Sequence, residues 1–548
     1  MPGLNEEIAA TSIWGTQQVS LQKDRKVQGV IGIWYGKGPG VDRSGDAIKH
    51  ANMAGTSALG GVLCIAGDDH ACKSSTLPHQ SDLNLRDMNV PIFSPGSVSE
   101  LMHYGVVALE LSRYSGCWTA MKVTSQTIDS TASIHVPRHD VPVHVPDAAS
   151  HALPPTGLNI QQPDDWNTQE TRMYAHKLPA VTAFLRANRL DRVILGASAQ
   201  AKLVVVAPGV SAWEVVEVLQ GLGIDEARAR ELGLAVLKVA VVWPLESAGV
   251  CEHVAHCEEV LVVEEKRALI ELQLKDALYH REGRRPRVVG KKDVDGTRLL
   301  QEEGELAYAD IRRALRRSLA RVFPEAPQAH APSSSAPVPA AAAAGMKRLP
   351  YFCAGCPHNS STVVPEGSQA MGGIGCHTLA LFMPGRFSLF THMGCEGANW
   401  IGMERFVDAP HVFANVGDGT YVHSAVLAIR AAVAAGATMT YKILYNGAVA
   451  MTGGQSNDTG ALSSPLQMAA QLRAEGVAEV VIVAELPDTY ARAVPGAGVS
   501  VVERGEMEAV QRRLRDVPGV TAIIFDQDCA TEKRRKRKRK ARMLADIY

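Results

Sequence analysis

The chain has 548 residues, 46% hydrophobic and 21% charged, which is an ordinary globular composition. That length exceeds what one hydrophobic core serves and predicts three or four domains. Lys and Arg number 56 and Asp and Glu number 57, so the net charge of −1 gives no support for nucleic acid as a partner. Every apolar stretch of about 18 residues is interrupted by a charge or a breaker, so we also expect no membrane association.

The ten cysteines are sparse and irregularly spaced, a pattern typical of reduced thiols. The first seven residues have no basic region followed by an apolar run, so we expect no signal peptide. Both observations predict a cytoplasmic protein.

Short apolar runs alternate with helical patterns, which predicts α/β domains built on doubly wound parallel sheets. Residues 1–135 form the first expected domain, with strands at 28–35, 61–66 and 118–123 and a helix at 100–112. Residues 136–165 are rich in Pro and Asp and lack periodicity, so we expect a linker or surface excursion, placed over 136–185.

The same pattern returns over residues 186–324 and again over residues 347–530. In the second domain we expect a helix near 213–222 and strands at 192–195, 203–206, 235–241 and 260–263. In the third we expect strands at 412–416, 441–444, 479–484 and 520–525.

Two segments outside these domains have distinctive compositions. Residues 325–346 contain Pro, Ser and an alanine run, which indicates a flexible linker. The tail 531–548 includes eight consecutive basic residues at 533–540, and their mutual repulsion predicts a solvated tail. An RNA-binding or nuclear-import role for this run would need an RNA-binding module that the sequence does not show.

Asp418 follows the apolar run 412–416, so it is expected at the carboxyl tip of a strand. Gly417 and Gly419 flank it and allow the backbone to approach a phosphate closely. The helix expected over 422–435 would direct its first N–H groups at that phosphate.

Asn446 follows the next expected strand, 28 residues after Asp418. One β-α-β crossover brings both strand tips to the same edge of a parallel sheet. A carboxylate, an amide oxygen, a backbone carbonyl and two diphosphate oxygens make a site that suits Mg2+. The alternative is a plain turn at a strand end.

The spacing from Gly417-Asp418-Gly419-Thr420 to Asn446 resembles the thiamine-diphosphate motif. Met451-Thr452-Gly-Gly-Gln455 resembles the Thr-Gly-Gly-Gln signature of 2-oxoacid:ferredoxin oxidoreductases. Cys353-Ala-Gly-Cys-Pro-His358 is similar to their Cys-x-Gly-Cys-x-His loop, and Met393-Gly394 with 397–402 is similar to their Met-Gly loop. Together these motifs resemble the indolepyruvate:ferredoxin oxidoreductase group.

The N-terminal part agrees with this resemblance. Asn5-Glu6-Glu7-Ile8-Ala9-Ala10 resembles the helix start of the pyrimidine-binding domain. The segments 35–43 and 66–75 resemble the corresponding segments of long-chain members of the group. The block 203–265 looks like a transketolase C-terminal type of domain. The resemblance covers nearly the whole chain except 136–185, and it implies three transketolase-like domains with the cofactor between the first and third.

The resemblance also implies site residues. Glu6 would hydrogen-bond the aminopyrimidine ring as the catalytic glutamate; alternatively it is only an acidic residue in a first helical turn. Mg2+ would be held by Asp418, Asn446 and the carbonyl of Ala448. The cofactor-binding candidates are Gly417, Asp418, Gly419, Thr420, Asn446, Ala448, Met451, Thr452, Cys353, His358, Met393 and Gly394.

Several of these residues have a second interpretation. Met451 or Met393 would wedge the cofactor into its bent shape, or would simply pack in a core. Cys353 and Cys356 could form a metal or redox pair, whereas the resemblance makes them the lining of the cofactor loop. His377, beside Cys376, could complete a three-ligand zinc set with them.

The resemblance implies oxidative decarboxylation of an aryl 2-oxoacid such as indolepyruvate, with coenzyme A and ferredoxin as co-substrates. The chain departs from the family in two places. The strand that precedes the Glu6 helix is expected to be missing. The cysteine-rich cluster motifs and the third family domain are also expected to be missing, so iron–sulfur clusters would lie on a partner subunit or a missing region. An oligomer is expected.

Two other functions remain open at this point. Without cluster cysteines, a non-oxidative thiamine-diphosphate-dependent decarboxylase or carboligase would suit the chain. The missing first strand would suit an inactive fragment or scaffold subunit.

Overall fold

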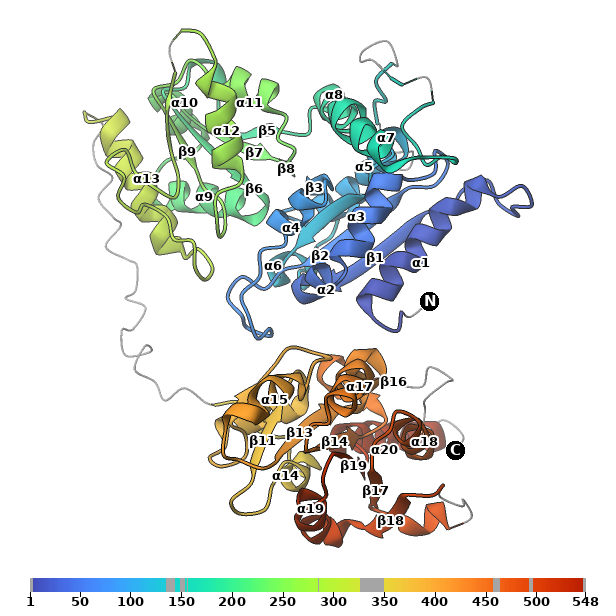
Figure 1. Ribbon diagram of the computed structural model, residues 1–548. Coiled ribbons are helices and arrows are strands. Elements are labelled where there is room, and N and C mark those ends of the chain that lie inside the picture. The colour runs from blue at the N-terminus through green and yellow to red at the C-terminus, as the bar shows by residue number, and fades with distance from the viewer. Residues whose placement is uncertain are drawn as a thin grey trace. The chain divides into compact units, whose positions relative to one another are not determined.

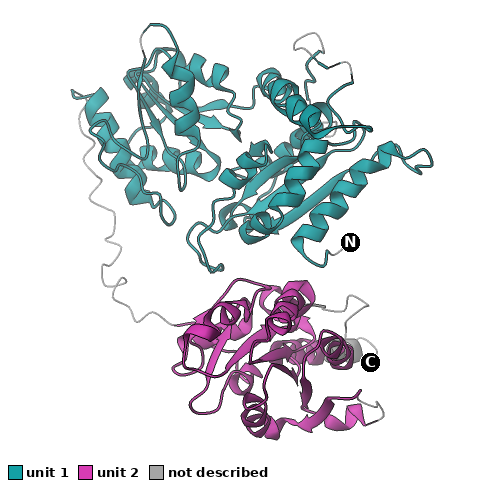
Figure 2. Ribbon diagram, in the orientation of Figure 1, with its two compact units in different colours: residues 1–336 teal, residues 337–548 magenta. Residues whose placement is uncertain are grey.

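The computed structural model forms two compact units, residues 1–336 and 337–548 (Figure 2). The division falls within the expected linker 325–346. Unit 1 contains two five-stranded sheets and unit 2 a seven-stranded sheet. The residues that the structure describes are 3–134, 143–147, 153–154, 156–283, 285–325, 349–456, 464–491 and 496–545.

The first sheet of unit 1 has the order β1-β2-β4-β3-β8. The first four strands are parallel, and β8 pairs antiparallel with β3. Neighbouring residues of β2 point to opposite faces: Val62 packs in one apolar core and Leu63 in another. Both faces are therefore covered, as in a doubly wound sheet (Figure 1). The strands are β1 Gly32–Lys37, β2 Val62–Gly67, β3 Ile92–Phe93, β4 Thr119–Val123 and β8 Val241–Trp243.

Helices connect these strands and cover the sheet (Figure 1). Two of them begin at side-chain caps: Asn5 accepts a hydrogen bond from the backbone N–H of Ile8, and Ser97 accepts one from that of Glu100. The helices are α1 Glu6–Gln18, α2 Gly38–Arg43, α3 Gly45–Ala54, α4 Asp82–Asp87, α5 Val98–Ser115 and α6 Ser125–Ile128.

The expectation of a linker over 136–185 is wrong for its second half. Helix α7 spans Trp166–Arg172, a π-helical turn spans Met173–Lys177, and α8 spans Leu178–Asn188. Pro179 is the second residue after the π-helical turn, within helical backbone that runs without a break from α7 into α8. The apolar side of α8 packs in the same core as α5, which supplies the stability that the local sequence does not indicate.

The second sheet has the order β10-β9-β6-β7-β5, with β5 antiparallel to β7. The single strand expected over 235–241 is two strands, because β8 leaves this sheet and joins the first. The elements are β5 Arg192–Gly196, β6 Leu203–Pro208, β7 Leu234–Val239, β9 Glu259–Val262, β10 Arg287–Val289, α9 Gly209–Gly221, α10 Glu226–Leu232, α11 Ser247–Val254, α12 Ile270–Tyr279 and α13 Tyr308–Val322.

The sheet of unit 2 is parallel throughout, in the order β12-β11-β13-β14-β19-β17-β18. Two apolar cores cover its two faces, with Val480 in one and Val481 in the other. Three α/β sheets are thus confirmed, with antiparallel edge strands only as additions to the first two. The strands are β11 Gln369–Gly372, β12 Leu389–Phe390, β13 Val412–Gly417, β14 Met439–Tyr445, β17 Glu479–Ala484, β18 Val499–Glu503 and β19 Val520–Asp526.

The helices of unit 2 include the stretch expected over 422–435. It is longer than predicted, running from α16 Asp418–Thr420 through a π-helical turn Tyr421–Ala425 into α17 Val426–Ala435. The remaining helices are α14 His358–Ser361, α15 Ala398–Met403, α18 Pro465–Ala474, α19 Met507–Arg515 and α20 Ala530–Ala545.

The basic run 533–540 lies within α20, and the side chains of residues 534–538 are exposed, so the run is helical while most of it stays in contact with solvent. Lys533 pairs with Glu485 at 2.6 Å, and the first arginines of the run contact backbone carbonyls of unit 2. These partners offset the repulsion between the charges of the run. Among the helices of the described residues, none combines the length and apolar character needed to cross a bilayer.

Asn52 offers a test of how unit 1 is held together. Its buried side chain donates to the carbonyls of Met88 and Asn89 and accepts from the N–H of Trp118, each at 2.8 Å. We expect Asn52→Leu to lower the free energy of unfolding by about 3 kcal/mol or more, because three buried backbone groups lose their partner.

The measurement is amide hydrogen exchange in the segment that contains Trp118. The control is Lys49→Met on the same helix, whose ion pair with Asp87 is exposed and should cost less than about 1 kcal/mol. Equal protection in the two variants would contradict the role given to Asn52.

Candidate functional site

Asp418 lies at the carboxyl tip of β13, as predicted, and its side chain is buried. One carboxylate oxygen, Oδ1, accepts from the N–H of Gly419 at 2.9 Å. The other, Oδ2, accepts from the N–H groups of Asn446 and Gly447, both at 2.9 Å. The carboxylate therefore joins the ends of two neighbouring strands, because β13 and β14 pair directly.

Asn446 follows β14, and its side-chain Oδ1 is buried without a hydrogen-bond partner in the described part of the chain. A buried oxygen without a hydrogen bond destabilises the fold unless a bound ligand or ion interacts with it. A carboxylate and an amide oxygen are the donors that Mg2+ prefers. The buried start of β15 Ala448–Val449 follows two residues later. The donors present at this edge thus fit a divalent cation of the magnesium type.

The loop after β11 is the part of the site that the sequence analysis missed. The carbonyl of Ile374 accepts from Thr420 Oγ1 at 3.2 Å. The ring of His377 lies 3.9 Å from the position that a Cβ on Gly417 would occupy. This loop therefore packs against the Gly417–Thr420 turn. Strand β11 has only four residues, too few for a clear pattern, but the glycines of Gly372-Gly373-Ile-Gly375 mark the loop that follows.

Glu396 connects this loop to the second expected cofactor loop, Met393-Gly394. Its Oε2 accepts from the N–H of Gly394 at 2.9 Å, and its side chain fills the space where a Cβ on Gly373 would lie. Glu396 is fully buried and was not predicted as a site residue. A buried carboxylate that accepts a backbone hydrogen bond fixes the shape of the loop.

His358 and His377 are both buried, and their ring centroids are 6.4 Å apart in an edge-on arrangement. Burial lowers the pKa of His358 to about 4. Burial, and secondarily the charge of His358, lowers the pKa of His377 to about 3. Both rings are neutral near pH 7, so His358 would contact a diphosphate by a hydrogen bond and not as a cation.

Four cysteines gather near these histidines, and they are free thiols. Burial raises the pKa of Cys376 to about 11, and the neighbouring Cys356, Cys529 and Cys353 raise it further. Burial likewise raises the pKa of Cys356, with smaller contributions from Cys353 and Cys529. Within the described ranges, no group of three or more His, Cys, Asp or Glu is arranged to hold a metal, which argues against the zinc set with His377.

Met451 and Thr452 lie in a 3-10 turn, Ala450–Thr452, and Met451 is 51% exposed. Because it is so exposed, Met451 is not a core residue of unit 2.

Glu6 belongs to unit 1, in the first turn of α1, where it is half-buried. A Cβ on Gly40 would lie 2.8 Å from Glu6 Cγ, so the glycine after β1 makes room for this side chain.

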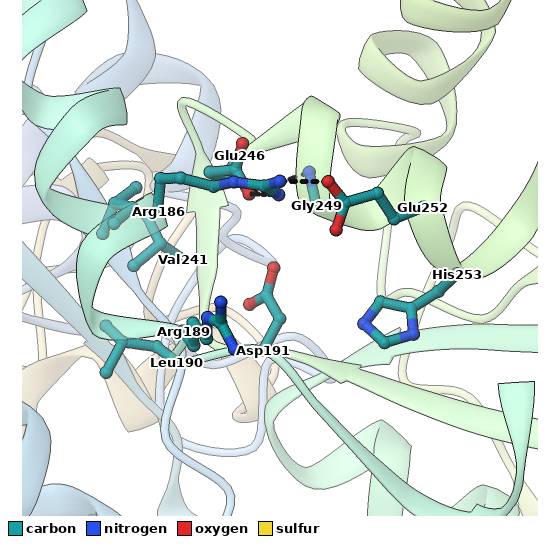
Figure 3. Close-up of a pocket in the computed structure, with 10 residues that line it drawn as sticks. Arg186, Arg189, Leu190, Asp191, Val241, Glu246, Gly249, Glu252 and His253 are labelled. Carbon is teal, nitrogen blue, oxygen red and sulfur yellow. Dashed lines mark hydrogen bonds and ion pairs between the residues drawn. The ribbon is translucent and has the colours of Figure 1, made fainter. Parts of the chain in front are cut away.

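A separate cavity of about 360 Å³ lies in unit 1, between α8, β8 and α11 (Figure 3). Arg186 reaches across it to pair with Glu246 and Glu252. Asp191 points into it, and burial raises the pKa of Asp191 to about 6. None of the predicted site residues lines this cavity.

Two family models match the chain. Residues 192–332 match an indolepyruvate oxidoreductase domain. Residues 373–504, which include Asp418 and Asn446, match the C-terminal TPP-binding domain of thiamine pyrophosphate enzymes.

Curated relatives cover most of the chain. Indolepyruvate oxidoreductase subunit IorA of Thermococcus kodakarensis is 24% identical over 531 residues, covering 90% of this chain and 76% of the relative. The protein of the same name from Archaeoglobus fulgidus is 24% identical over 509 residues, covering 90% and 74%.

The chain is thus similar to thiamine pyrophosphate enzymes and to indolepyruvate oxidoreductase subunits. Solved structures with partial likeness are an inactive β4 tetramer of a split-gene transketolase and a 2-oxoglutarate:ferredoxin oxidoreductase from Magnetococcus marinus. The first has a TM-score of 0.34 and 12% identity, covering 57% of this chain and 82% of that chain. The second has a TM-score of 0.39 and 15% identity, covering 58% and 57%.

The neutral state of His377 predicts a pH dependence for this oxidoreductase. Its pKa is lower in the folded state than the ordinary value of about 6.5, so the unfolded chain binds the extra proton as the pH falls below that value. The free energy of unfolding should therefore drop by about 2 kcal/mol between pH 7 and pH 5 on account of this ring.

We expect His377→Asn to reduce this pH dependence of unfolding, measured by calorimetry at pH 7 and pH 5. The exposed His392→Asn is the control and should leave the dependence unchanged. If both variants keep the full dependence, His377 is not its source.

Proposed function

We propose that this enzyme uses thiamine diphosphate and Mg2+ to decarboxylate an aryl 2-oxoacid of the indolepyruvate kind oxidatively. Coenzyme A would accept the acyl group, and ferredoxin would accept the electrons. The observation that carries the proposal is the buried Asp418 carboxylate, which joins the two strand ends. Near it, the buried Oδ1 of Asn446 has no hydrogen-bond partner among the residues that the structure describes.

In this proposal Asp418, Asn446 and the carbonyl of Ala448 hold Mg2+. Asp418 follows β13, and Asn446 and Ala448 follow β14, so all three lie at the carboxyl edge of the parallel sheet, where ligands of α/β sheets bind. Gly417 and Gly419 leave the backbone open to a diphosphate, and Thr420 fixes the neighbouring loop through Ile374.

When bound, thiamine diphosphate supplies the nucleophilic carbon and the electron sink that decarboxylation needs. Glu6 is the proposed hydrogen-bond partner of its aminopyrimidine. Its place beside the glycine turn Gly38–Gly40 supports this role, because the turn lies at the carboxyl end of β1. His358, Met393, Gly394, Met451, Thr452 and Cys353 are proposed to line the cofactor loops.

The electron route is the second part of the proposal. The relatives are named as subunits, which supports an oligomeric enzyme with a partner chain. The iron–sulfur clusters are proposed to lie on that partner or on a missing region. Cytoplasmic location stays a prediction from the cysteine pattern. An assay with indolepyruvate, coenzyme A and the partner subunit should reduce ferredoxin, whereas aldehyde release without any electron acceptor would support a non-oxidative decarboxylase instead.

The first test removes the proposed metal ligand. Asp418→Ala should weaken binding of thiamine diphosphate in the presence of Mg2+ by about 100-fold or more, because a metal ligand and the link between the strand ends are both lost. Isothermal titration calorimetry measures this. Asp408→Ala, in the exposed loop before β13, is the control. Parent-like binding by Asp418→Ala would refute the metal assignment.

The second test concerns catalysis and not binding. Glu6→Gln should lower kcat by about 100-fold or more, because proton transfer by a positioned side chain typically contributes that much. The cofactor Kd should change far less. The neighbouring Glu7→Gln is exposed in the same helical turn and should leave kcat unchanged. An unchanged kcat in Glu6→Gln would remove this residue from the catalytic role.

A further inference from the structure

The basic run at residues 533–540 contacts a loop of the proposed cofactor site. Arg535 Nη1 donates to the carbonyl of Gly453 at 3.0 Å. The same guanidinium pairs with Glu532, one turn earlier on α20. The pair holds the arginine in place, although its side chain is 49% exposed. A backbone carbonyl that accepts from a charged donor is held more strongly than one in a neutral hydrogen bond.

The loop itself is shaped to lie against α20. Gly454 has a φ of +79°, a conformation that favours glycine. A Cβ at this position would collide with Glu532 Oε1 and would lie 2.8 Å from Arg535 Nη1. The positive φ favours glycine at this position, and the ends of the Glu532 and Arg535 side chains lie against it.

The next arginine along the helix reaches a second loop. Arg534 donates to the carbonyl of Ala354, in the segment between Cys353 and Cys356. A Cβ on Gly355 would lie 4.0 Å from the Cβ of Ala530, so this glycine packs against the start of α20. One helix thus contacts both the Cys353–Cys356 loop and the Gly453–Gly454 loop.

The helix has its own anchor. Lys533 pairs with Glu485, the residue after β17, at 2.6 Å, and α20 begins four residues after β19 ends. Both strands belong to the unit 2 sheet, where they pair with each other. Arg534 and Arg535 therefore link the two loops, through α20, to the sheet that also carries Asp418.

We propose that α20 is a clamp for the cofactor loops and that Arg535 is a positioning residue of the site. It holds the Gly453 peptide, and through it the Thr452–Gly454 loop that follows Asn446 and Ala448, in the shape that receives the cofactor. The inference rests on the proposed function for what the loop binds, but the clamp itself is a property of this chain without any ligand.

The first readout needs no cofactor. Arg535→Gln should speed amide hydrogen exchange in the segment 449–454 of the ligand-free protein by about tenfold, because one charge-assisted hydrogen bond is lost. Arg535→Lys, which keeps a charged donor, should restore part of the protection. Arg537→Gln is the matched control, since it removes the same charge from an exposed position of the same helix.

The second readout is the calorimetric Kd for thiamine diphosphate with Mg2+. Arg535→Gln should raise it about tenfold, Arg535→Lys less, and Arg537→Gln not at all. Gly454→Ala tests the contact from the loop side and should act like Arg535→Gln, with circular dichroism confirming that both variants fold.

The outcomes separate the two proposals. If the parent protein does not bind thiamine diphosphate, the proposed function fails, while the exchange experiment still tests the clamp. If the parent binds and Arg535→Gln matches Arg537→Gln in either exchange or Kd, the positioning role is overturned.

Discussion

The Asp418 carboxylate is the interaction on which the site depends. It accepts N–H groups from its own turn and from the end of the neighbouring strand, so one buried charge fixes two strand tips together. A buried carboxylate is costly unless it is hydrogen-bonded, and here the backbone supplies those bonds. The same arrangement leaves the Asn446 amide oxygen buried at the end of the neighbouring strand, without a hydrogen-bond partner among the described residues.

The loops around this carboxylate are held from several sides. The loop after β11 packs on the Gly417–Thr420 turn, and Glu396 ties the Met393-Gly394 loop to it. On another side, α20 contacts the loops at Ala354 and Gly453. Loops of this length pay a large entropic cost to become ordered, and buried or charged hydrogen bonds to rigid elements offset that cost.

Neutral side chains lie near the charged Asp418 carboxylate. His358 and His377 are uncharged near pH 7 because they are buried, and the thiol of Cys376 stays protonated for the same reason. A weakly polar surrounding strengthens the attraction between a carboxylate and a cation. The electrostatics of the site therefore suit one divalent ion and its anionic ligand.

The sequence by itself determined the α/β class, the strand tips at Asp418 and Asn446, and the family resemblance, because buried parallel strands and glycine turns leave strong local patterns. Tertiary structure decided what local patterns do not encode. The four-residue β11, the helix α8 and the transfer of β8 between sheets depend on distant packing partners. The basic run 533–540 is another case: its side chains are mostly exposed, as a solvated tail predicts, but only folding brings Glu485 and two backbone carbonyls of unit 2 within reach of the run, which lies in a helix.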